Sequence, residues 1–408
     1  MRWPAFALGS LLLVAPGCSR SEPRDPALSP PSAPLAPKGD PIVHVPLGGS
    51  GFQALPTRDG AWVFVSITAP DAGSPGIALY RRGDDGLSFV RRVPLDEAPA
   101  GMVLTHDGKL LIAAAGNRLA FLDVERLTGG REDAVLGALV EPGGKLGRIY
   151  VNVTADDRTL FCSDESARTI TVVDLEKARA SGFLPSAVIG KIPVGNAPIA
   201  LTFSPDGRTL YTTSQGMPDL GWPRKCRPEG SSPETPPNHP EGAVIVVDVE
   251  RAKVDPPHAV VGTIPAGCNP VRLVLSPGGD VAYVSARGMD ELLAFDTKKL
   301  LAEPARALVG RVPVGPSPVG VAVIDGGRRV LVTSSNRFSS KPTDRQPLFV
   351  IDTARIAEGA AAVVGTLPAG AFPREMRVTA DGQTLYLTNF VSKTLQVVDL
   401  TRLPVTPR

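Results

Sequence analysis

Histidine is scarce in this sequence, which has four among its 408 residues: His44, His106, His239 and His258. Their spacing matches no metal-ligand motif, so we predict no metal site. The motifs CxxCH for haem, GxSxG for a serine nucleophile and HExxH for zinc are also missing, as is a phosphate-binding loop. From motifs we therefore predict no cofactor and no catalytic residue.

Neither sign of charge is in excess, because 43 Lys and Arg oppose 41 Asp and Glu. No basic stripe marks a nucleic-acid surface, so we expect no nucleic-acid partner. After the first residues, no apolar run approaches the length of a membrane span. Hydrophobic residues make up 43% of the chain, which is enough for a large buried core.

The first 17 residues have the layout of an export signal, with one Arg, an apolar run too short to span a bilayer, and small residues before Cys18. VAPGC at residues 14–18 resembles the lipobox of bacterial lipoproteins, although Ala15 stands where Leu is usual and Pro16 is atypical. The resemblance implies diacylation of Cys18 and anchoring to the bacterial cell envelope, on its periplasmic or cell-surface side. The alternative is an ordinary secretory signal that is cut near Cys18.

Residues 18–40 are rich in Pro, Ser and Ala and show no apolar periodicity. Such a segment buries too little apolar surface to offset the entropy of ordering it. We therefore predict a disordered, Pro-rich tether that holds the folded part, residues 41–408, away from a membrane.

A repeat unit recurs seven times after the tether. Its marker is a turn pair after a short apolar run, at Asp59-Gly60, Asp107-Gly108, Asp156-Asp157, Asp206-Gly207, Gly278-Gly279, Gly326-Gly327 and Asp381-Gly382. The intervals between markers are 48, 49, 50, 72, 48 and 55 residues. Short alternating strands with such turns at this period predict an all-β fold, a seven-bladed β-propeller of four-stranded antiparallel blades.

The last unit lacks its fourth strand. Its first three strands are predicted at residues 374–379, 384–389 and 394–399, and nothing after them resembles a fourth. Residues 41–49 (PIVHVPLGG) match the fourth-strand pattern of another unit, GRVPVG at 310–315. We predict that residues 42–47 complete the last blade beside residues 394–399, which closes the ring and leaves no open edge.

The propeller units resemble those of the YVTN-repeat β-propeller family. The resemblance rests on Tyr386-Leu387-Thr388-Asn389, on SPDGRTLYTTS at residues 204–214 and on GNAPIALTF at 195–203, and it covers essentially the whole folded part. It implies that strand A, the first of each blade, lies nearest the axis and usually carries a small residue two positions after the Pro between blades.

The equivalent positions here are Gln53, Gly101, Tyr150, Ala200, Arg272, Gly320 and Glu375. We predict that the four large polar residues among them, with neighbouring Arg374, project toward the channel mouth and bind a polar or anionic ligand. The alternative is that Arg272 and Glu375 satisfy each other or line a water-filled tunnel.

Loop lengths indicate which face carries the site. Strands within a blade alternate in direction, so the loops from strand B to strand C share one face with the loops between blades. Three B-to-C loops are enlarged, at residues 69–76, 215–242 and 337–347. Because binding residues concentrate on loops held by a rigid scaffold, we predict the site on this face, although neutral variation in loop length explains the same pattern.

Cys226 and Cys268 are predicted to form a disulfide. An export signal leads to an oxidising compartment, and the parity argument places loop 215–242 and the interblade loop 265–270 on the same face of neighbouring blades. The bridge fixes loop 215–242 over the channel mouth, and two unrelated thiols are the alternative. Cys162 is expected to be a packed thiol, and the Asp that ends each strand C is expected to cap backbone N–H groups.

Two functional hypotheses follow. The first is a non-enzymatic, membrane-anchored lipoprotein whose propeller is a scaffold for a protein or small-molecule ligand in the cell envelope. The second is a lactonase-type hydrolase acting at the channel mouth, which the family resemblance implies because some seven-bladed relatives open sugar lactones. Similarity of fold is weak evidence of function, and no base-like His is expected on the channel face, so we prefer the first.

Overall fold

The computed structural model describes residues 40–403, except 219, 223, 224, 233, 340 and 342, together with 406 and 407. The predicted signal, the lipidation site Cys18 and all but the last residue of the tether lie outside the described residues. In the described part, no helix combines the length and apolar character needed to cross a membrane.

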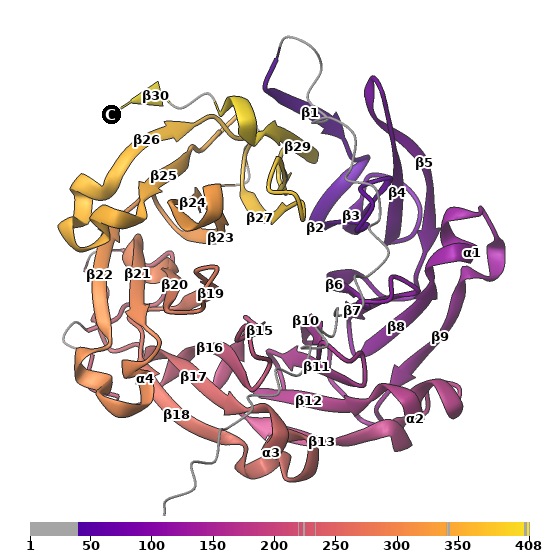
Figure 1. Ribbon diagram of the computed structural model, residues 1–408, viewed down its shortest axis with the longest axis horizontal. Helices are drawn as coiled ribbons and strands as arrows, with labels where there is room; N and C mark the ends of the chain where they lie inside the picture. Colours follow the sequence, from indigo (N-terminus) through magenta and orange to yellow (C-terminus); the bar gives the residue numbers. More distant parts are fainter. Residues whose placement is uncertain are drawn as a thin grey trace, which may run out of the picture. The chain divides into compact units, whose positions relative to one another are not determined.

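Seven antiparallel sheets surround a central axis and form a β-propeller, as predicted (Figure 1). Blade 1 comprises β2 (Gly49–Pro56), β3 (Trp62–Pro70), β4 (Gly76–Gly83) and β5 (Gly86–Pro94). Blade 2 comprises β6 (Pro99–Leu104), β7 (Leu110–Ala115), β8 (Arg118–Asp123) and β9 (Val135–Val140). Blade 3 comprises β10 (Arg148–Val153), β11 (Thr159–Asp164), β12 (Thr169–Asp174) and β13 (Val188–Pro193).

In blade 4, strand A is split in two. Blade 4 comprises β14 (Asn196–Pro198), β15 (Thr202–Phe203), β16 (Thr209–Met217), β17 (Glu241–Asp248) and β18 (Val260–Pro265). Blade 5 comprises β19 (Pro270–Leu275), β20 (Val281–Ala286), β21 (Glu291–Asp296) and β22 (Leu308–Pro313). Blade 6 comprises β23 (Pro318–Ile324), β24 (Arg329–Ser334), β25 (Leu348–Asp352) and β26 (Val363–Leu367), and the short β30 (Thr406–Pro407) pairs with β26.

Blade 7 is completed by the N-terminal strand. It comprises β27 (Pro373–Val378), β28 (Thr384–Asn389), β29 (Thr394–Asp399) and β1 (Ile42–Pro46), which lies beside β29 in Figure 1. The pairing is antiparallel and runs from Ile42 opposite Val398 to Pro46 opposite Thr394. This confirms the predicted ring closure.

The A-to-B turns explain why the repeat marker is an Asp-Gly pair. In blade 1, the Thr57 hydroxyl donates to Asp59 Oδ1 at 2.5 Å, and the same carboxylate accepts the Ala61 N–H at 3.0 Å. Gly60 has a φ of +67°, a conformation that glycine adopts without steric cost. Equivalent Thr or Ser and Asp pairs begin the turns of blades 2, 3, 4 and 7.

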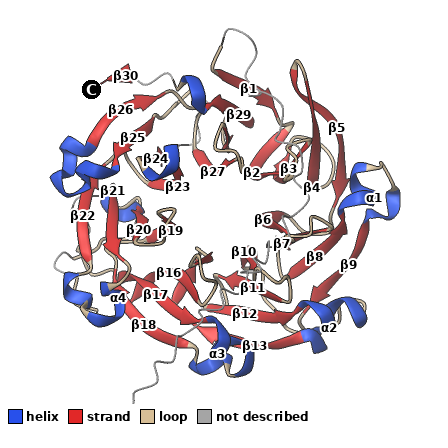
Figure 2. Ribbon diagram, in the orientation of Figure 1, coloured by secondary structure: helices blue, strands red, loops and turns tan. Residues whose placement is uncertain are grey.

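The C-to-D connections contain short helices that the sequence analysis did not predict. They lie around the outer rim of the ring (Figure 2). The α-helices are α1 (Val124–Thr128), α2 (Leu175–Ala180), α3 (Val249–Val254) and α4 (Lys299–Ala302). The 3-10 helices of the described residues are η1 (Glu132–Ala134), η2 (Pro185–Ala187), η3 (Pro256–His258), η4 (Arg287–Met289), η5 (Pro304–Arg306), η6 (Asp325–Gly327), η7 (Thr353–Ala362) and η8 (Leu400–Arg402), of which η4 belongs to a B-to-C loop and η6 to an A-to-B turn. The strand C aspartates cap several of them, as expected; Asp123, for example, accepts the Arg126 N–H.

Neighbouring blades are joined by apolar packing and by a repeated hydrogen bond. Buried residues of blades 2 and 3, including Ile112, Phe121 and Leu160, form one of several such interblade cores. Among the described residues, a strand B hydroxyl donates to a strand A carbonyl of the next blade in six cases: Ser66 to Ala100, Thr68 to Pro99, Ser163 to Ile199, Thr213 to Val271, Ser285 to Val319 and Thr388 to Phe52. These bonds fix where each strand A lies around the axis.

Candidate functional site

A cavity of about 370 Å³ lies at the ring axis on the face formed by the B-to-C and interblade loops. Its wall comes from the strand A segments and loops of blades 3 to 7. The lining residues are Ile149, Tyr150, Glu165, Ala197, Ile199, Gln215, Glu229, Val271, Arg272, Arg287, Val319, Arg337, Phe372 and Arg374. We call this cavity the axial pocket. Its size is in the range of small-molecule sites.

Three side chains meet across the axis at the base of the pocket. Arg272 Nε donates to Glu375 Oε2 at 2.7 Å, and the Tyr150 hydroxyl lies 3.4 Å from the same oxygen. These residues belong to blades 5, 7 and 3, which are not neighbours, so their contacts must cross the axis. Arg272 and Glu375 are both buried and satisfy each other, the alternative considered from the sequence.

Aromatic rings link this ion pair to a second guanidinium. Arg272 Cζ lies 3.8 Å from the centre of the Tyr150 ring, and Arg374 Cζ lies 4.0 Å from the centre of the Phe52 ring. The Phe52 and Tyr150 rings are 5.4 Å apart. The two cations thus face two adjacent rings, an arrangement that offsets part of the cost of burying them.

Small residues on two blades make room for the large ones. A Cβ atom at Gly101 would lie 2.6 Å from Tyr150 Cδ1, and one at Gly320 would lie 2.8 Å from the Arg374 carbonyl oxygen. Both distances are shorter than real Cβ contacts. The small residues that the repeat usually carries at this position therefore alternate here with side chains that fill the axis.

Arg374 differs from the other guanidinium groups of the pocket in its lack of a carboxylate partner. Within the described residues it forms no ion pair, and its buried Nε has no hydrogen-bond partner. The ring centres of Phe372 and Phe390 lie 5.4 and 5.3 Å from Arg374 Cζ, respectively. Burial, and then repulsion from Arg337, lowers the pKa of Arg374 to about 10, so the group stays protonated at neutral pH.

Arg287 and Arg337 share one carboxylate, that of Glu229. Arg287 Nη2 donates to Glu229 Oε2 and to Gln215 Oε1, each at 2.7 Å, and Arg337 Nη1 lies 3.5 Å from Glu229 Oε2. Glu229 and Gln215 both belong to the segment from β16 to the long B-to-C loop of blade 4. This loop therefore supplies the counter-charge for two arginines of blades 5 and 6.

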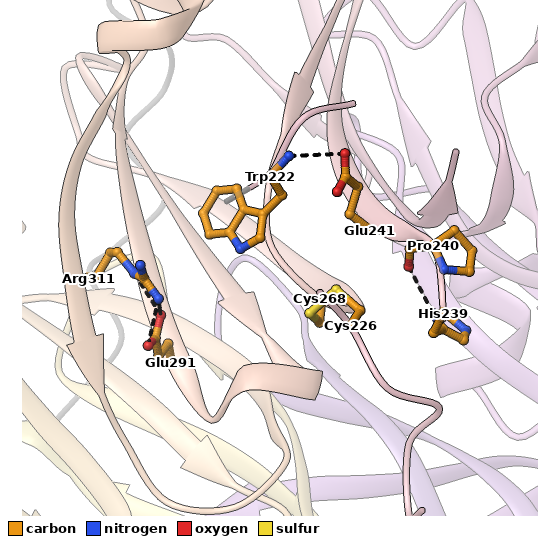
Figure 3. The surroundings of a disulfide bond; sticks show 8 residues. All are labelled: Trp222, Cys226, His239, Pro240, Glu241, Cys268, Glu291 and Arg311. Atoms are coloured by element: carbon orange, nitrogen blue, oxygen red, sulfur yellow. Dashed lines mark hydrogen bonds and ion pairs between the residues drawn. A yellow bond between two sulfur atoms is a disulfide. The ribbon is translucent and has the colours of Figure 1, made fainter. Parts of the chain in front are cut away.

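A disulfide anchors the same loop. Cys226 and Cys268 are bonded, with their Cα atoms 5.5 Å apart (Figure 3). The Cys226 carbonyl also accepts the His239 N–H at 3.0 Å, and the Trp222 N–H donates to Glu241 at 3.1 Å. Cys226 is three residues before Glu229, so the bridge restrains the position of that carboxylate. Cys162 is a free, fully buried thiol whose pKa is raised to about 11 by burial.

Glu165 is one of two carboxyl groups that line the pocket, and the other is Glu229. Glu165 directly follows β11, and its carboxylate has no hydrogen bond or ion pair to any residue that the structure describes. Burial raises the pKa of Glu165, while Arg374, Arg287 and Arg337 act in the opposite direction. Proton uptake by Glu165 therefore changes the charge of the pocket.

The five predicted ligand contacts divide into two groups. Tyr150, Arg272 and Arg374 line the axial pocket, but Gln53 and Glu375 do not. The Gln53 side chain is buried, and its Oε1 accepts the Met102 N–H at 2.5 Å. This bond joins strand A of blade 1 to strand A of blade 2. Glu375 is held beneath the pocket by Arg272.

Five polar lining residues were not predicted from the sequence: Glu165, Gln215, Glu229, Arg287 and Arg337. A signal was present for three of these, because Glu165, Gln215 and Arg287 each lie six residues after the strand B residue that pairs with the last Asp of strand C. The same register position, compared across the blades as for strand A, identifies all three. Glu229 and Arg337 lie inside long irregular loops, where no register applies.

The described residues contain no group of three or more His, Cys, Asp or Glu side chains that could hold a metal ion. None of the four histidines lines the axial pocket. His106 instead lies 2.7 Å from Asp157, and His258 lies 2.9 Å from Asp255, both at exposed positions. The pocket chemistry is thus that of guanidinium and carboxylate groups.

The fold of this chain is similar to that of solved structures from other proteins. A chain of Kuenenia stuttgartiensis hydrazine synthase gives a TM-score of 0.64 at 16% sequence identity, covering 89% of this chain and 98% of that chain. A chain from a structure of the mitotic checkpoint complex gives 0.61 at 12% identity, covering 93% of this chain and 99% of that one. No family model and no curated protein matches the sequence. Identities this low indicate a shared fold alone.

Proposed function

We propose that this chain is a bacterial lipoprotein of the YVTN-repeat type whose β-propeller acts as a binding scaffold in the cell envelope. In this proposal Cys18 carries the lipid anchor, residues 18–40 form the tether, and the axial pocket receives the ligand. The observation that carries the binding role is Arg374, a largely buried cation that lines the axial pocket and has no carboxylate partner among the described residues. Buried charges are usually paired, so such a group indicates a place for an anion.

The anchor is tested by cell fractionation. Wild-type protein is expected in the membrane fraction, and Cys18→Ser in the soluble fraction of the periplasm. Mass spectrometry of the extracted protein is expected to show a lipidated peptide that begins at Cys18. A wild-type protein that is soluble and cut elsewhere would contradict the anchor.

The binding role is tested by native mass spectrometry after incubation with a small-molecule extract of the periplasm. We expect a bound mass on the wild type that is lost in Arg374→Met. Arg377→Met is the matched control, because Arg377 is an exposed residue of the same strand, β27. Equal capture by both variants, or capture by neither the wild type nor the control, would refute a ligand site at Arg374.

A lactone hydrolase is the second candidate, and Glu165 is the observation that favours it. Glu165 has a raised pKa, which suits a general base. The three guanidinium groups that act on it would stabilise negative charge that develops in the transition state. Lactone turnover by the wild type that disappears in Glu165→Gln would make this the better assignment. We rank it second because the other carboxylate of the lining, Glu229, is bonded to Arg287 and none of the four histidines lines the pocket.

A further inference from the structure

We propose that the ligand of the axial pocket is a small organic anion with one carboxylate and a short apolar body, bound through the guanidinium of Arg374. This inference rests on the proposed binding function and adds the chemical class of the ligand. It follows from the charge balance of the pocket, from the one guanidinium that has no partner there, and from the apolar part of the wall.

The charges in and directly beneath the pocket leave a single positive charge unbalanced. The cations are Arg272, Arg287, Arg337 and Arg374, and the carboxylates are Glu165, Glu229 and Glu375. With all three carboxylates ionised, four positive charges thus face three negative ones. One monoanion neutralises the site, whereas a dianion would leave a net negative charge in a poorly solvated cavity.

Arg374 is the cation of the pocket that forms no ion pair with a described residue, whereas Arg337 lies 3.5 Å from Glu229. Arg272 donates to Glu375, and Arg287 donates to both Glu229 and Gln215. Arg374 is held by contacts with aromatic rings, which leave its N–H groups without acceptors among the described residues. A carboxylate matches the geometry of a guanidinium and accepts two parallel hydrogen bonds from it.

The remaining wall indicates an apolar body. Ile149, Ile199, Val271 and Val319 line the pocket from the strand A segments of blades 3 to 6. Each methylene group buried against such a wall increases affinity by roughly fourfold, which follows from about 0.8 kcal/mol per CH₂. The Gln215 amide is not open to a polar ligand body, because it already donates to Ala197 and accepts from Arg287.

Calorimetry with a matched five-carbon series tests the class of ligand. The probes are pentanoate, pentanedioate and 2-aminopentanoate, which carry one carboxylate, two carboxylates, and a carboxylate with an ammonium group; inorganic phosphate is the fourth probe. Pentanoate is expected to bind at least about tenfold tighter than the other three. Pentanedioate and doubly charged phosphate exceed the single unbalanced positive charge, and 2-aminopentanoate, which has no net charge, leaves it unbalanced. From propanoate to pentanoate, affinity is expected to rise by about fourfold per methylene.

Variants of full-length protein locate the binding. Arg374→Met is expected to weaken pentanoate binding by about 10- to 100-fold, Arg374→Lys less, and the control Arg377→Met not at all. Circular dichroism and melting temperature establish that all three variants are folded. Arg374→Lys keeps the cation, so it separates the loss of charge from the loss of structure.

Each other result has a defined meaning. If pentanedioate, 2-aminopentanoate or phosphate binds tighter than pentanoate and depends on Arg374, the monocarboxylate class is wrong and the pocket remains a ligand site. If pentanoate binding is independent of Arg374, or if none of the probes binds, the inference is overturned. The proposed function is tested separately, by native mass spectrometry of ligand captured from the periplasmic extract.

Discussion

Two guanidinium groups at the ring axis are buried in different ways. Burial lowers the pKa of Arg272 to about 10, but Glu375 and the Tyr150 ring keep it charged and fixed. Arg374 has rings around it and no carboxylate bonded to it within the described part of the chain. We therefore interpret Arg272 as a structural element and Arg374 as the proposed binding group.

Replacing one member of the buried pair is expected to cost more than replacing both. Arg272→Met leaves Glu375 buried without its partner, and we expect a loss of about 3–5 kcal/mol in the free energy of unfolding. The double variant Arg272→Met/Glu375→Gln removes both charges and is expected to recover much of that loss. Urea unfolding measures both, and a double variant as unstable as the single one would contradict the assignment.

The charge of Glu165 is expected to control ligand affinity through pH. As the pH falls through its raised pKa, the carboxylate takes up a proton and one negative charge leaves the pocket. The charged groups that act on it are Arg374, Arg287, Arg337 and Asp164. The affinity for an anion is therefore expected to increase by roughly five- to tenfold toward lower pH, at pH values where the ligand itself stays ionised.

Glu165→Gln provides the matched comparison for this pH effect. The variant carries no charge at residue 165 at any pH, so we expect it to bind pentanoate tightly at pH 7 and to lose the pH dependence. Calorimetry between pH 5 and pH 8 is the measurement. A wild-type affinity that falls toward low pH, or a variant with the same profile as the wild type, would show that Glu165 does not act on the ligand.

At the scale of elements, strands and loops contribute different chemistry to the pocket. The strand A segments supply apolar side chains and three of the polar ones, and their positions are fixed by hydroxyl-to-carbonyl bonds between blades. The B-to-C loops supply Glu165, Glu229, Arg287 and Arg337, which set the charge. Changes in these loops therefore alter the ligand preference without changing the ring.

The disulfide between Cys226 and Cys268 is expected to stabilise the long loop and to keep the Glu229 carboxylate in contact with Arg287 and Arg337. The bridge spans 42 residues, and removing it by Cys226→Ser/Cys268→Ser is expected to cost up to about 4 kcal/mol of unfolding free energy. Non-reducing peptide mapping of periplasmic protein is expected to recover the two peptides joined. Alkylation of both thiols in the native protein would exclude the bridge, whereas Cys162 is expected to react only after unfolding.

At the scale of the molecule, the two ends of the propeller meet in blade 7. β1 pairs with β29 along its whole length, and the Tyr80 hydroxyl of blade 1 donates to the Pro46 carbonyl at 3.2 Å. Without β1, the outer edge of β29 would be left unpaired. Ring closure therefore depends on one five-residue strand at the start of the folded part.

Deletion of residues 41–48 is expected to cause aggregation or a large loss of stability, because an unpaired strand edge is a template for pairing with another chain. Deletion of residues 20–38, within the predicted tether, is the control and is expected to leave the melting temperature unchanged. Calorimetry and light scattering compare the two truncated proteins. Equal stability would contradict the role of β1 in closure.

The sequence by itself determined the number of blades, the closing strand and the face that carries the enlarged loops. These features are periodic in one dimension: a turn pair that recurs seven times and a unit with one strand missing specify the ring before any contact is known. Parity of strand direction also placed Cys226 and Cys268 on one face. The strand A register identified Tyr150, Arg272 and Arg374 among the lining residues of the pocket.

The tertiary structure alone decided which charges are paired. Arg272 and Glu375 are 103 residues apart and meet across the axis, whereas Gln53, at the same register position, turns to the Met102 N–H of the next blade. Register specifies the blade and the height of a side chain, but not the direction in which it points or the partner it reaches. Glu229 reaches Arg287 through a long loop without periodicity, so its role depends on packing that no repeat pattern encodes.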